Sequence, residues 1–242
     1  MLGRLFLGLL LSLVLNAAIG KPKDSSVLQF SEPENLRVSS VMAQKILLEA
    51  YKRIGIKINF LALPAARSIL MWDDGRLDGI SYRLIDSQLE NGIRLTTPIT
   101  KGDVVAFSIK QRFTVTGYES LQPYLVGYMA GVPFLLERLK NIPRKEPAPS
   151  IESLFKKLEL GRSDVVVESR LSSCFAQKLG ISNIIILEPA LETTLGFHYL
   201  HKRQQKLVAP LEKVLRDMES DGTIKKYQDE ATRDFMLRCE PK

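Results

Sequence analysis

The chain has 242 residues, of which 45% are apolar and 25% charged, and its formal net charge is +7. These values are ordinary for a globular protein, and the length allows one large domain or two smaller lobes with an ample core. The basic residues are scattered, without an arginine-rich arm or a basic stripe interleaved with aromatic side chains, which argues against nucleic acid as a partner. The two cysteines and two histidines lack the spacing of a metal site, and we expect neither a metal nor a cofactor.

The first twenty residues have the pattern of a secretory signal peptide. Residues 1–4 are a short basic start, residues 5–15 are apolar, and Ala18 and Gly20 are the small residues that signal peptidase requires. The apolar run is too short to span about 30 Å of hydrocarbon comfortably, so a retained membrane anchor is the less favoured alternative. We therefore expect residues 1–20 to be removed before Lys21 and the mature protein to work outside the cytoplasm.

Strands and helices alternate over the next eighty residues. Residues 56–61 alternate apolar and polar side chains, as a half-buried strand does, and Pro64 suits the first turn of the helix that follows. Strands are predicted at 27–30, 56–61 and 77–81, and helices at 41–54 and 65–72. This βαβαβ order predicts a parallel sheet covered by helices.

A second alternating set follows an apolar strand at 104–109. It comprises a strand at 125–128, a helix at 132–139, a loop rich in proline and charge at 141–149, a helix capped by Ser150 that ends at 160, a strand at 164–167, a helix at 171–179 and a strand at 184–186. Residues 194–200 are extended, and the tail from 204 to 236 is helical with a break at Asp221 and Gly222. Ligand clefts in such folds lie at the carboxyl ends of strands.

Several short motifs, in a fixed order, resemble those of one protein family. They are the Asp-Gly-Arg-Leu-Asp-Gly run at 74–79 within the stretch 43–79, the Thr-Thr-Pro-Ile segment at 96–99, the strand and glycine at 126–131, the Gly-Arg-Ser-Asp strand at 160–167 and the Asp-Gly-Thr-Ile end at 221–224. Together they resemble the periplasmic solute-binding proteins of family 3, the amino-acid-type receptors of ABC importers.

The resemblance implies an α/β fold of two Rossmann-like lobes joined by a two-strand hinge, with a ligand cleft between the lobes, which is the type 2 periplasmic-binding-protein fold. Lobe 1 would comprise residues 21–105, with 200–242 returning to it, and lobe 2 would comprise 106–199. The strands near 104–109 and 194–200 would be the hinge, and closure around the ligand would be a hinge motion.

An amino-acid site of this family needs a cation for the ligand carboxylate, and two arginines are candidates. Arg83 follows a predicted strand at the expected cleft end, where its planar fork could hold a carboxylate, although a surface arginine at a strand end fits equally. Arg67 lies in the first turn of a helix, where a cation opposes the helix dipole. It therefore calls for an anionic ligand or, alternatively, a salt bridge between the lobes.

Five further residues are candidates for the cleft. Glu168 and Ser169 end the strand at 164–167, near the place where the family holds the ligand ammonium, and Ser169 occupies the matching position. Tyr82 and Tyr128 could line the cleft or simply pack in a half-buried position. Gly131 precedes a helix whose first backbone N–H groups suit an anion.

Two cysteines remain for an oxidising compartment. Cys174 and Cys239 form one disulfide on one interpretation, closing a long loop. On the other, Cys174 is a buried free thiol and Cys239 lies in a frayed tail.

The resemblance predicts a monomeric periplasmic receptor that captures a small polar, amino-acid-like ligand for an ABC importer and is not an enzyme. Its partners would be the small-molecule ligand and either an inner-membrane ABC permease or a sensor protein. Two alternatives stay open. One is a ligand-sensing module for a membrane partner, and the other is a dehydratase-like enzyme in which Glu168 acts as general acid.

Overall fold

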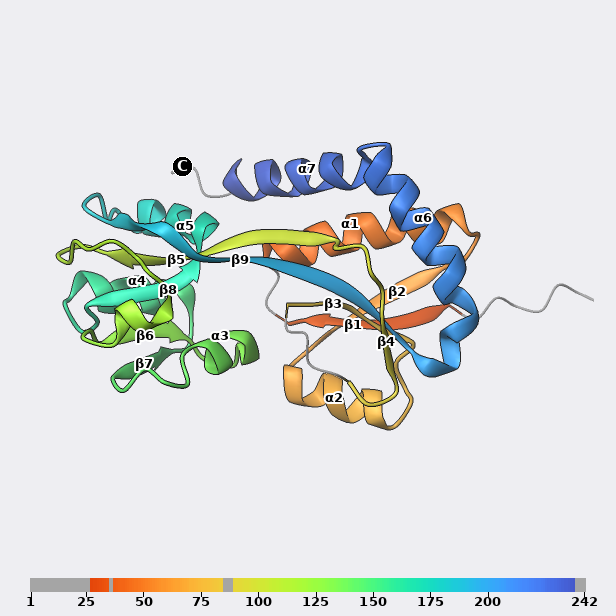
Figure 1. The fold of residues 1–242 in the computed structure, drawn as a ribbon, viewed down its shortest axis with the longest axis horizontal. Coiled ribbons are helices and arrows are strands. Elements are labelled where there is room, and N and C mark those ends of the chain that lie inside the picture. Colours follow the sequence, from red (N-terminus) through yellow and green to blue (C-terminus); the bar gives the residue numbers. More distant parts are fainter. Residues whose placement is uncertain (1–26, 35–36, 85–88, 238–242) are drawn as a thin grey trace, which may run out of the picture.

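The computed structural model describes residues 27–34, 37–84 and 89–237, which form two α/β lobes side by side (Figure 1). The predicted signal peptide at 1–20, its cleavage site and Cys239 lie outside the described residues. Within the part of the chain that is described, no helix is long and apolar enough to cross a membrane.

The first lobe contains the N-terminal elements and the C-terminal helices. Its elements are β1 (Leu28–Pro33), α1 (Val38–Arg53), β2 (Ile58–Leu63), α2 (Ala65–Asp73), β3 (Gly79–Arg83), β4 (Gly92–Arg94), the 3-10 helix η3 (Lys202–Leu207), α6 (Val208–Ser220) and α7 (Thr223–Leu237). Strands β1, β2 and β3 are parallel, as the βαβαβ order predicts. Helices α1, α6 and α7 cover one face of this sheet and α2 covers the other (Figure 1).

The second lobe repeats the same architecture. Its elements are η1 (Tyr118–Leu121), β6 (Val126–Met129), α3 (Pro133–Arg138), β7 (Lys145–Ala148), α4 (Ile151–Glu159), β8 (Val165–Ser169), η2 (Arg170–Ser172) and α5 (Ser173–Lys178). Strands β6, β7 and β8 are parallel, and the predicted cap of α4 is present, since Ser150 Oγ accepts a hydrogen bond from the Ser153 backbone N–H at 3.1 Å.

Two long strands, β5 (Thr100–Ser108) and β9 (Ile185–His201), pass through both lobes (Figure 1). They pair antiparallel from Thr100 opposite Gly196 to Ser108 opposite Ile185, with a shift of register between Val104 and Ala106. They join the two halves into one curled sheet of order β2-β1-β3-β9-β5-β8-β6-β7, with β4 added beside β9. This pair of strands corresponds to the expected two-strand connection.

Two expectations about secondary structure were wrong. The strands at 184–186 and 194–200 are one strand of 17 residues, because Leu187 on one side of a register shift, and Glu192 and Thr193 on the other, continue the pairing with β5. The loop predicted at 141–149 contains β7, which pairs parallel with β6. Since β7 is an edge strand with a single neighbour, Pro147 is tolerated there.

Each lobe has its own hydrophobic core. In the first, the buried face of α1 packs with β1 and α6, and Tyr51 lies 5.0 Å from Phe30 between ring centres. Trp72 is fully buried on the other face of the sheet. In the second lobe, Phe107 of β5 meets Phe155 of α4 edge to face at 5.3 Å. Two separate cores allow the lobes to behave as rigid bodies about the strands that connect them.

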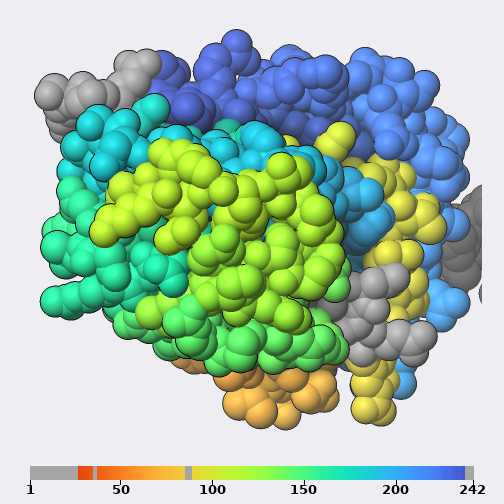
Figure 2. Space-filling model, turned by 60° about the vertical axis from the view of Figure 1, so that its left-hand side comes forward, coloured from red at the N-terminus to blue at the C-terminus, as the bar shows by residue number. Residues whose placement is uncertain are grey.

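The C-terminal helices also reach across the molecule. Seen from the side of the second lobe, the blue surface of α6 and α7 runs along the upper edge, above the green and cyan surface of that lobe (Figure 2). Phe235 of α7 contacts Phe175 of α5 with ring centres 5.8 Å apart. The lobes are therefore in contact beyond the two connecting strands.

Candidate functional site

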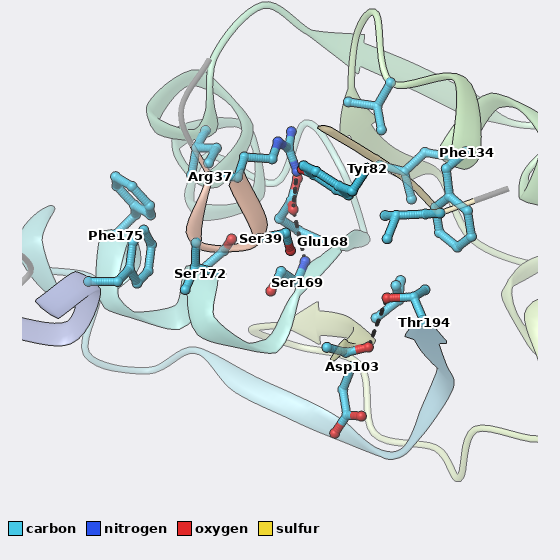
Figure 3. Close-up of a pocket in the computed structure, with 18 residues that line it drawn as sticks. Arg37, Ser39, Tyr82, Asp103, Phe134, Glu168, Ser169, Ser172, Phe175 and Thr194 are labelled. Atoms are coloured by element: carbon cyan, nitrogen blue, oxygen red, sulfur yellow. Dashed lines mark hydrogen bonds and ion pairs between the residues drawn. The ribbon is translucent and has the colours of Figure 1, made fainter. Parts of the chain in front are cut away.

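A cavity of about 100 Å³ lies between the lobes (Figure 3). It is lined by the start of α1 and by β3 from the first lobe, by α3 and the end of β8 from the second, and by both connecting strands. The polar side chains that line it are Arg37, Ser39, Tyr82, Asp103, Glu168, Ser169, Ser172 and Thr194. A molecule held in this cavity would touch both lobes at once.

An ion pair crosses the cavity from one lobe to the other. Arg37, the residue before α1, donates from Nη1 to Glu168 Oε1 at 2.9 Å, and Glu168 lies in β8 (Figure 3). The Glu168 side chain is 2% exposed and that of Arg37 is 27% exposed. Because the carboxylate is buried, removing its partner would leave a charge that is neither hydrated nor paired, a strongly destabilising change.

The two carboxylate oxygens of Glu168 differ in what they accept. Oε1 receives the Arg37 guanidinium and also the Ser169 backbone N–H at 2.9 Å. Oε2 is buried and accepts no hydrogen bond from any residue that the structure describes. Buried polar atoms normally have a partner, and an unsatisfied one costs about 1–3 kcal/mol, more when it is charged. Of the two carboxylate oxygens, Oε2 is therefore the acceptor that still lacks a donor.

Tyr82 brings a neutral hydroxyl to the same space. It is 8% exposed, and its hydroxyl lies 3.5 Å from Ser40 Oγ of α1. Burial raises the pKa of Tyr82, so the phenol stays protonated at neutral pH. The ring therefore contributes an uncharged wall with one hydrogen-bonding group.

The second carboxylate of the lining, Asp103, already accepts hydrogen bonds from other side chains at both of its oxygens. Its Oδ1 accepts from Thr193 Oγ1 at 2.8 Å, and its Oδ2 accepts from Arg170 Nε at 3.1 Å. Arg170 also binds both carboxylate oxygens of Glu188 in β9, at 2.6 and 3.1 Å. This network ties β5, β9 and η2 together at the crossing and makes Asp103 a part of the framework.

Apolar side chains form much of the remaining wall. Phe134 of α3 lies on one side of the cavity and Phe175 of α5 on the other (Figure 3). Leu84, Leu135 and Phe235 also line it, and Phe235 contacts Phe175. Such a combination of apolar walls and a few convergent polar groups is typical of small-molecule sites.

The structure brings three of the predicted site residues together. Tyr82, Glu168 and Ser169 all line the cavity, because each lies at or near the carboxyl end of its strand. The remaining four, Arg67, Arg83, Tyr128 and Gly131, are not among the residues that line it. Their role in binding stays a prediction that the geometry does not favour.

The two predicted arginines lie on the first lobe and do not line the cavity. Arg67 is exposed on α2. Arg83 ends β3 with its guanidinium carbon 6.0 Å from the centre of the Tyr199 ring, and partial burial lowers the pKa of this arginine. Neither arginine is therefore placed to bind the carboxylate of a ligand in the cavity.

Tyr128 and Gly131 lie in the second lobe. Tyr128 is 7% exposed and packs in the core of that lobe. Gly131, in the left-handed region at φ +71°, forms the exposed turn before α3. That helix has only six residues and begins at Pro133, which has no N–H to offer an anion.

Most of the lining residues were not recognised in the sequence, and Arg37, Asp103 and Phe134 are among them. The helix expected from residue 41 begins at Val38, so Arg37 was not placed at a helix start. In the sequence, Asp103 is a polar residue directly before an apolar strand, and Phe134 has the pattern of an ordinary core residue. For Phe134 the sequence did hold a signal, because the residue lies in the first turn of the helix that follows the predicted cleft residue Gly131.

The structure describes one of the two cysteines of the predicted disulfide. Cys174 is fully buried in α5 and is disulfide-bonded rather than free. Its expected partner, Cys239, lies outside the described residues, so the pairing stays a prediction. Among the described residues no group of three or more histidine, cysteine, aspartate or glutamate side chains could hold a metal ion.

Comparisons with known proteins identify relatives of the sequence and of the fold. No protein-family model matches the chain. It is 27% identical over 203 residues to an uncharacterised protein of Shewanella oneidensis, covering 80% of this chain and 76% of that protein.

Solved structures match the fold over most of its length. A histidine kinase sensor domain with similarity to periplasmic binding proteins matches with a TM-score of 0.67 and 13% identity, over 86% of this chain and 97% of that one. The GluR0 ligand-binding core in complex with L-glutamate matches at 0.70 with 9% identity, over 87% and 100%. Tv2483 bound to L-arginine matches at 0.63 with 19% identity, over 85% and 90%. The fold is therefore that of the type 2 periplasmic-binding-protein-like domains.

Proposed function

We propose that this protein is a receptor for a small polar, amino-acid-like solute that carries an amino group and binds between the two lobes. The observation that supports it is the buried Glu168 carboxylate, which faces a cavity shared by both lobes and has an oxygen without a donor. An ammonium group is the natural partner of such an oxygen, since charge-assisted hydrogen bonds are about twice as strong as neutral ones.

Binding would be coupled to the closing of the lobes. The Arg37–Glu168 pair joins α1 to β8, and the β5–β9 pair provides the connection about which the lobes would rotate. A ligand that contacts both lobes favours the closed state by its differential affinity for that state. No chemical step is required, because the affinity itself is the function.

The place of action follows from the sequence rather than from the described residues. A signal peptide at 1–20 would deliver the protein to the periplasm, where an ABC permease of the inner membrane would accept the loaded receptor. A second role, reporting the ligand to a membrane sensor, is supported by the likeness to a histidine kinase sensor domain and to the BvgS VFT2 domain of Bordetella pertussis, which matches with a TM-score of 0.62. Both roles use the same cavity.

A thermal-shift screen of residues 21–242 tests the proposal. We expect at least one amino acid or amine to raise the melting temperature, because a ligand that binds only the folded state stabilises it by RT ln(1 + [L]/Kd). Glu168→Gln should remove the shift, whereas the matched control Glu146→Gln should keep it, since Glu146 pairs with Lys157 on the second lobe and does not line the cavity.

The same screen separates a receptor from an enzyme. A receptor returns its ligand unchanged after prolonged incubation, as mass spectrometry of the supernatant would show, whereas a dehydratase-like enzyme would convert it. The absence of a shift with every amino acid and amine would contradict the proposed function.

A further inference from the structure

The charged side chains that line the cavity already have partners. Among the described residues that line it, the charged ones are Arg37, Asp103 and Glu168. Arg37 is used by Glu168, and both oxygens of Asp103 are used by Thr193 and Arg170. The described lining therefore offers no free cation to a ligand carboxylate, and Glu168 Oε2 is the atom that lacks a donor.

A ligand carboxylate would bind unfavourably in the same cavity. Arg37 is the sole cationic side chain in the described lining, and it would have to leave Glu168 to receive a carboxylate. The buried glutamate would then lose its present partner while a second anion approached it. Since like charges repel strongly where water is excluded, the carboxylate of an amino acid would weaken binding rather than strengthen it.

The remaining wall selects a short apolar body. Val132, Phe134, Leu135 and Ile151 of the second lobe and Leu84 of the first line the cavity beside the Glu168 carboxylate. The cavity has a volume of about 100 Å³. This size suits an aliphatic chain of a few carbons rather than a long or polycyclic one.

We propose that the ligand class is a small aliphatic amine, bound through its ammonium to Glu168 and through its apolar body to the α3 side of the cavity, and that an α-carboxylate is neither required nor favoured. This inference rests on the proposed function: it keeps the amino group of the proposed ligand and drops the carboxylate. The ammonium donates to Glu168 Oε2 and leaves the Arg37–Glu168 pair in place.

Three matched ligands test the inference by isothermal titration of residues 21–242. Leucine carries the amine, the carboxylate and the branched chain, 3-methylbutylamine lacks only the carboxylate, and 4-methylpentanoate lacks only the amine. We expect 3-methylbutylamine to bind at least tenfold more tightly than leucine and the acid to show no heat of binding. Leucine binding as tightly as the amine, or more tightly, overturns the inference but leaves the receptor standing.

Binding by none of the three also overturns the inference. A rise in melting temperature with other amino acids in the thermal-shift screen would then still support the proposed function. No rise with any compound in that screen would contradict both the inference and the proposed function.

Two variants place the amine in the cavity. Glu168→Gln should lower the affinity for 3-methylbutylamine at least tenfold, while Glu146→Gln should leave it unchanged. Should Glu168→Gln fail to fold, Val132→Phe keeps the carboxylate and fills the α3 side of the cavity, and it should abolish amine binding in a folded protein. Unchanged affinity in a folded Glu168→Gln or Val132→Phe protein would place the amine elsewhere and overturn the inference.

Discussion

At the scale of single residues, one buried carboxylate dominates the site. Glu168 is 2% exposed, is held by Arg37 from the opposite lobe and keeps one oxygen without a donor. A buried acceptor seldom lacks a donor in a folded protein, because the hydrogen bonds to water that it loses on burial are then not replaced. The pair Arg37–Glu168 is thus both a contact between the lobes and the polar centre of the cavity.

Removing the arginine should destabilise the folded protein. Arg37→Ala leaves the buried Glu168 without its ionic partner, and we expect the free energy of unfolding to fall by about 2 kcal/mol, the usual scale for a hydrogen bond to a charged group. Urea denaturation of both proteins measures the difference. Lys140→Ala, which breaks an exposed pair with Glu137, should cost less than about 1 kcal/mol, and an equal loss in the two variants would argue against a special role for the Arg37–Glu168 pair.

A second buried residue makes the stability depend on pH. His198 of β9 is fully buried, its Nδ1 lies 2.8 Å from the Ile80 carbonyl and its Nε2 lies 2.9 Å from the Tyr51 hydroxyl. Burial lowers the pKa of His198 to about 4, from an ordinary value near 6.5. The neutral imidazole is therefore the form that the folded state accepts.

The sign of the effect follows from proton linkage. Below pH 6.5 the unfolded chain binds a proton at His198 and the folded one does not, so the stability contributed by this group is complete above pH 6.5 and is lost as the pH falls towards 4. The lowered pKa corresponds to about 3 kcal/mol at most.

Urea denaturation at several pH values checks the role of His198. The stability advantage of the wild type over His198→Gln should shrink between pH 7 and pH 4.5. A constant difference across that range would show that His198 does not titrate as proposed.

At the scale of elements, β5 and β9 pack closely where Thr100 pairs with Gly196. A Cβ atom at Gly196 of β9 would lie 2.1 Å from Thr100 Oγ1 and 3.1 Å from Tyr82 Cδ2, so the strands approach more closely than a side chain permits. By contrast, a Cβ atom at Gly102 of β5 would meet nothing within 4 Å. The two glycines lie on paired strands and form a matched test.

Gly196→Ala should destabilise the protein and Gly102→Ala should not. We expect a loss of about 1–3 kcal/mol for the first, because the neighbours must shift to admit the methyl group, and a change within about 0.5 kcal/mol for the second. Thermal or urea unfolding of both variants gives the comparison. Equal stability of the two would mean that the crossing yields more easily than its contacts imply.

Much of this element-scale picture could be predicted from the chain. Alternation along residues 56–61, the cap at Ser150 and the break at Asp221 predict elements that the structure contains, because local patterns reflect which face is buried. The strand β7 could not be predicted, since its proline and charges are typical of a loop and only the neighbouring β6 makes it a strand.

The site was predictable only where it followed local rules. Tyr82, Glu168 and Ser169 lie at or near strand ends, where clefts of this fold occur. Arg37 is 131 positions from Glu168 in the chain, and no local pattern relates residues that only the packing of two lobes brings together. Arg67 opposes the helix dipole near the start of α2, but its exposure to solvent makes that position tolerable without a ligand.

At the scale of the whole molecule, the C-terminal helix connects the two lobes. Phe235 of α7 touches Phe175 of α5, and the neighbouring Cys174 is disulfide-bonded. The chain contains one other cysteine, Cys239, two residues beyond the end of α7. We propose that a Cys174–Cys239 disulfide fastens the helix of the first lobe to the second.

Reduction should therefore loosen the molecule. The chain-entropy model assigns about 4 kcal/mol to a loop of this length, so a reducing agent should lower the melting temperature markedly. The double variant Cys174→Ser/Cys239→Ser should melt at the lower temperature and should not respond to the reductant. A wild type that melts at the same temperature in both conditions would exclude a stabilising disulfide.

A crystal structure with the tightest ligand from the screens tests the central claim most directly. We predict that the ligand lies between the lobes with its nitrogen within hydrogen-bond distance of Glu168 Oε2 and its apolar body against Phe134 and Leu135. A ligand bound outside this cavity, or inside it with its nitrogen turned away from Glu168, would contradict the account.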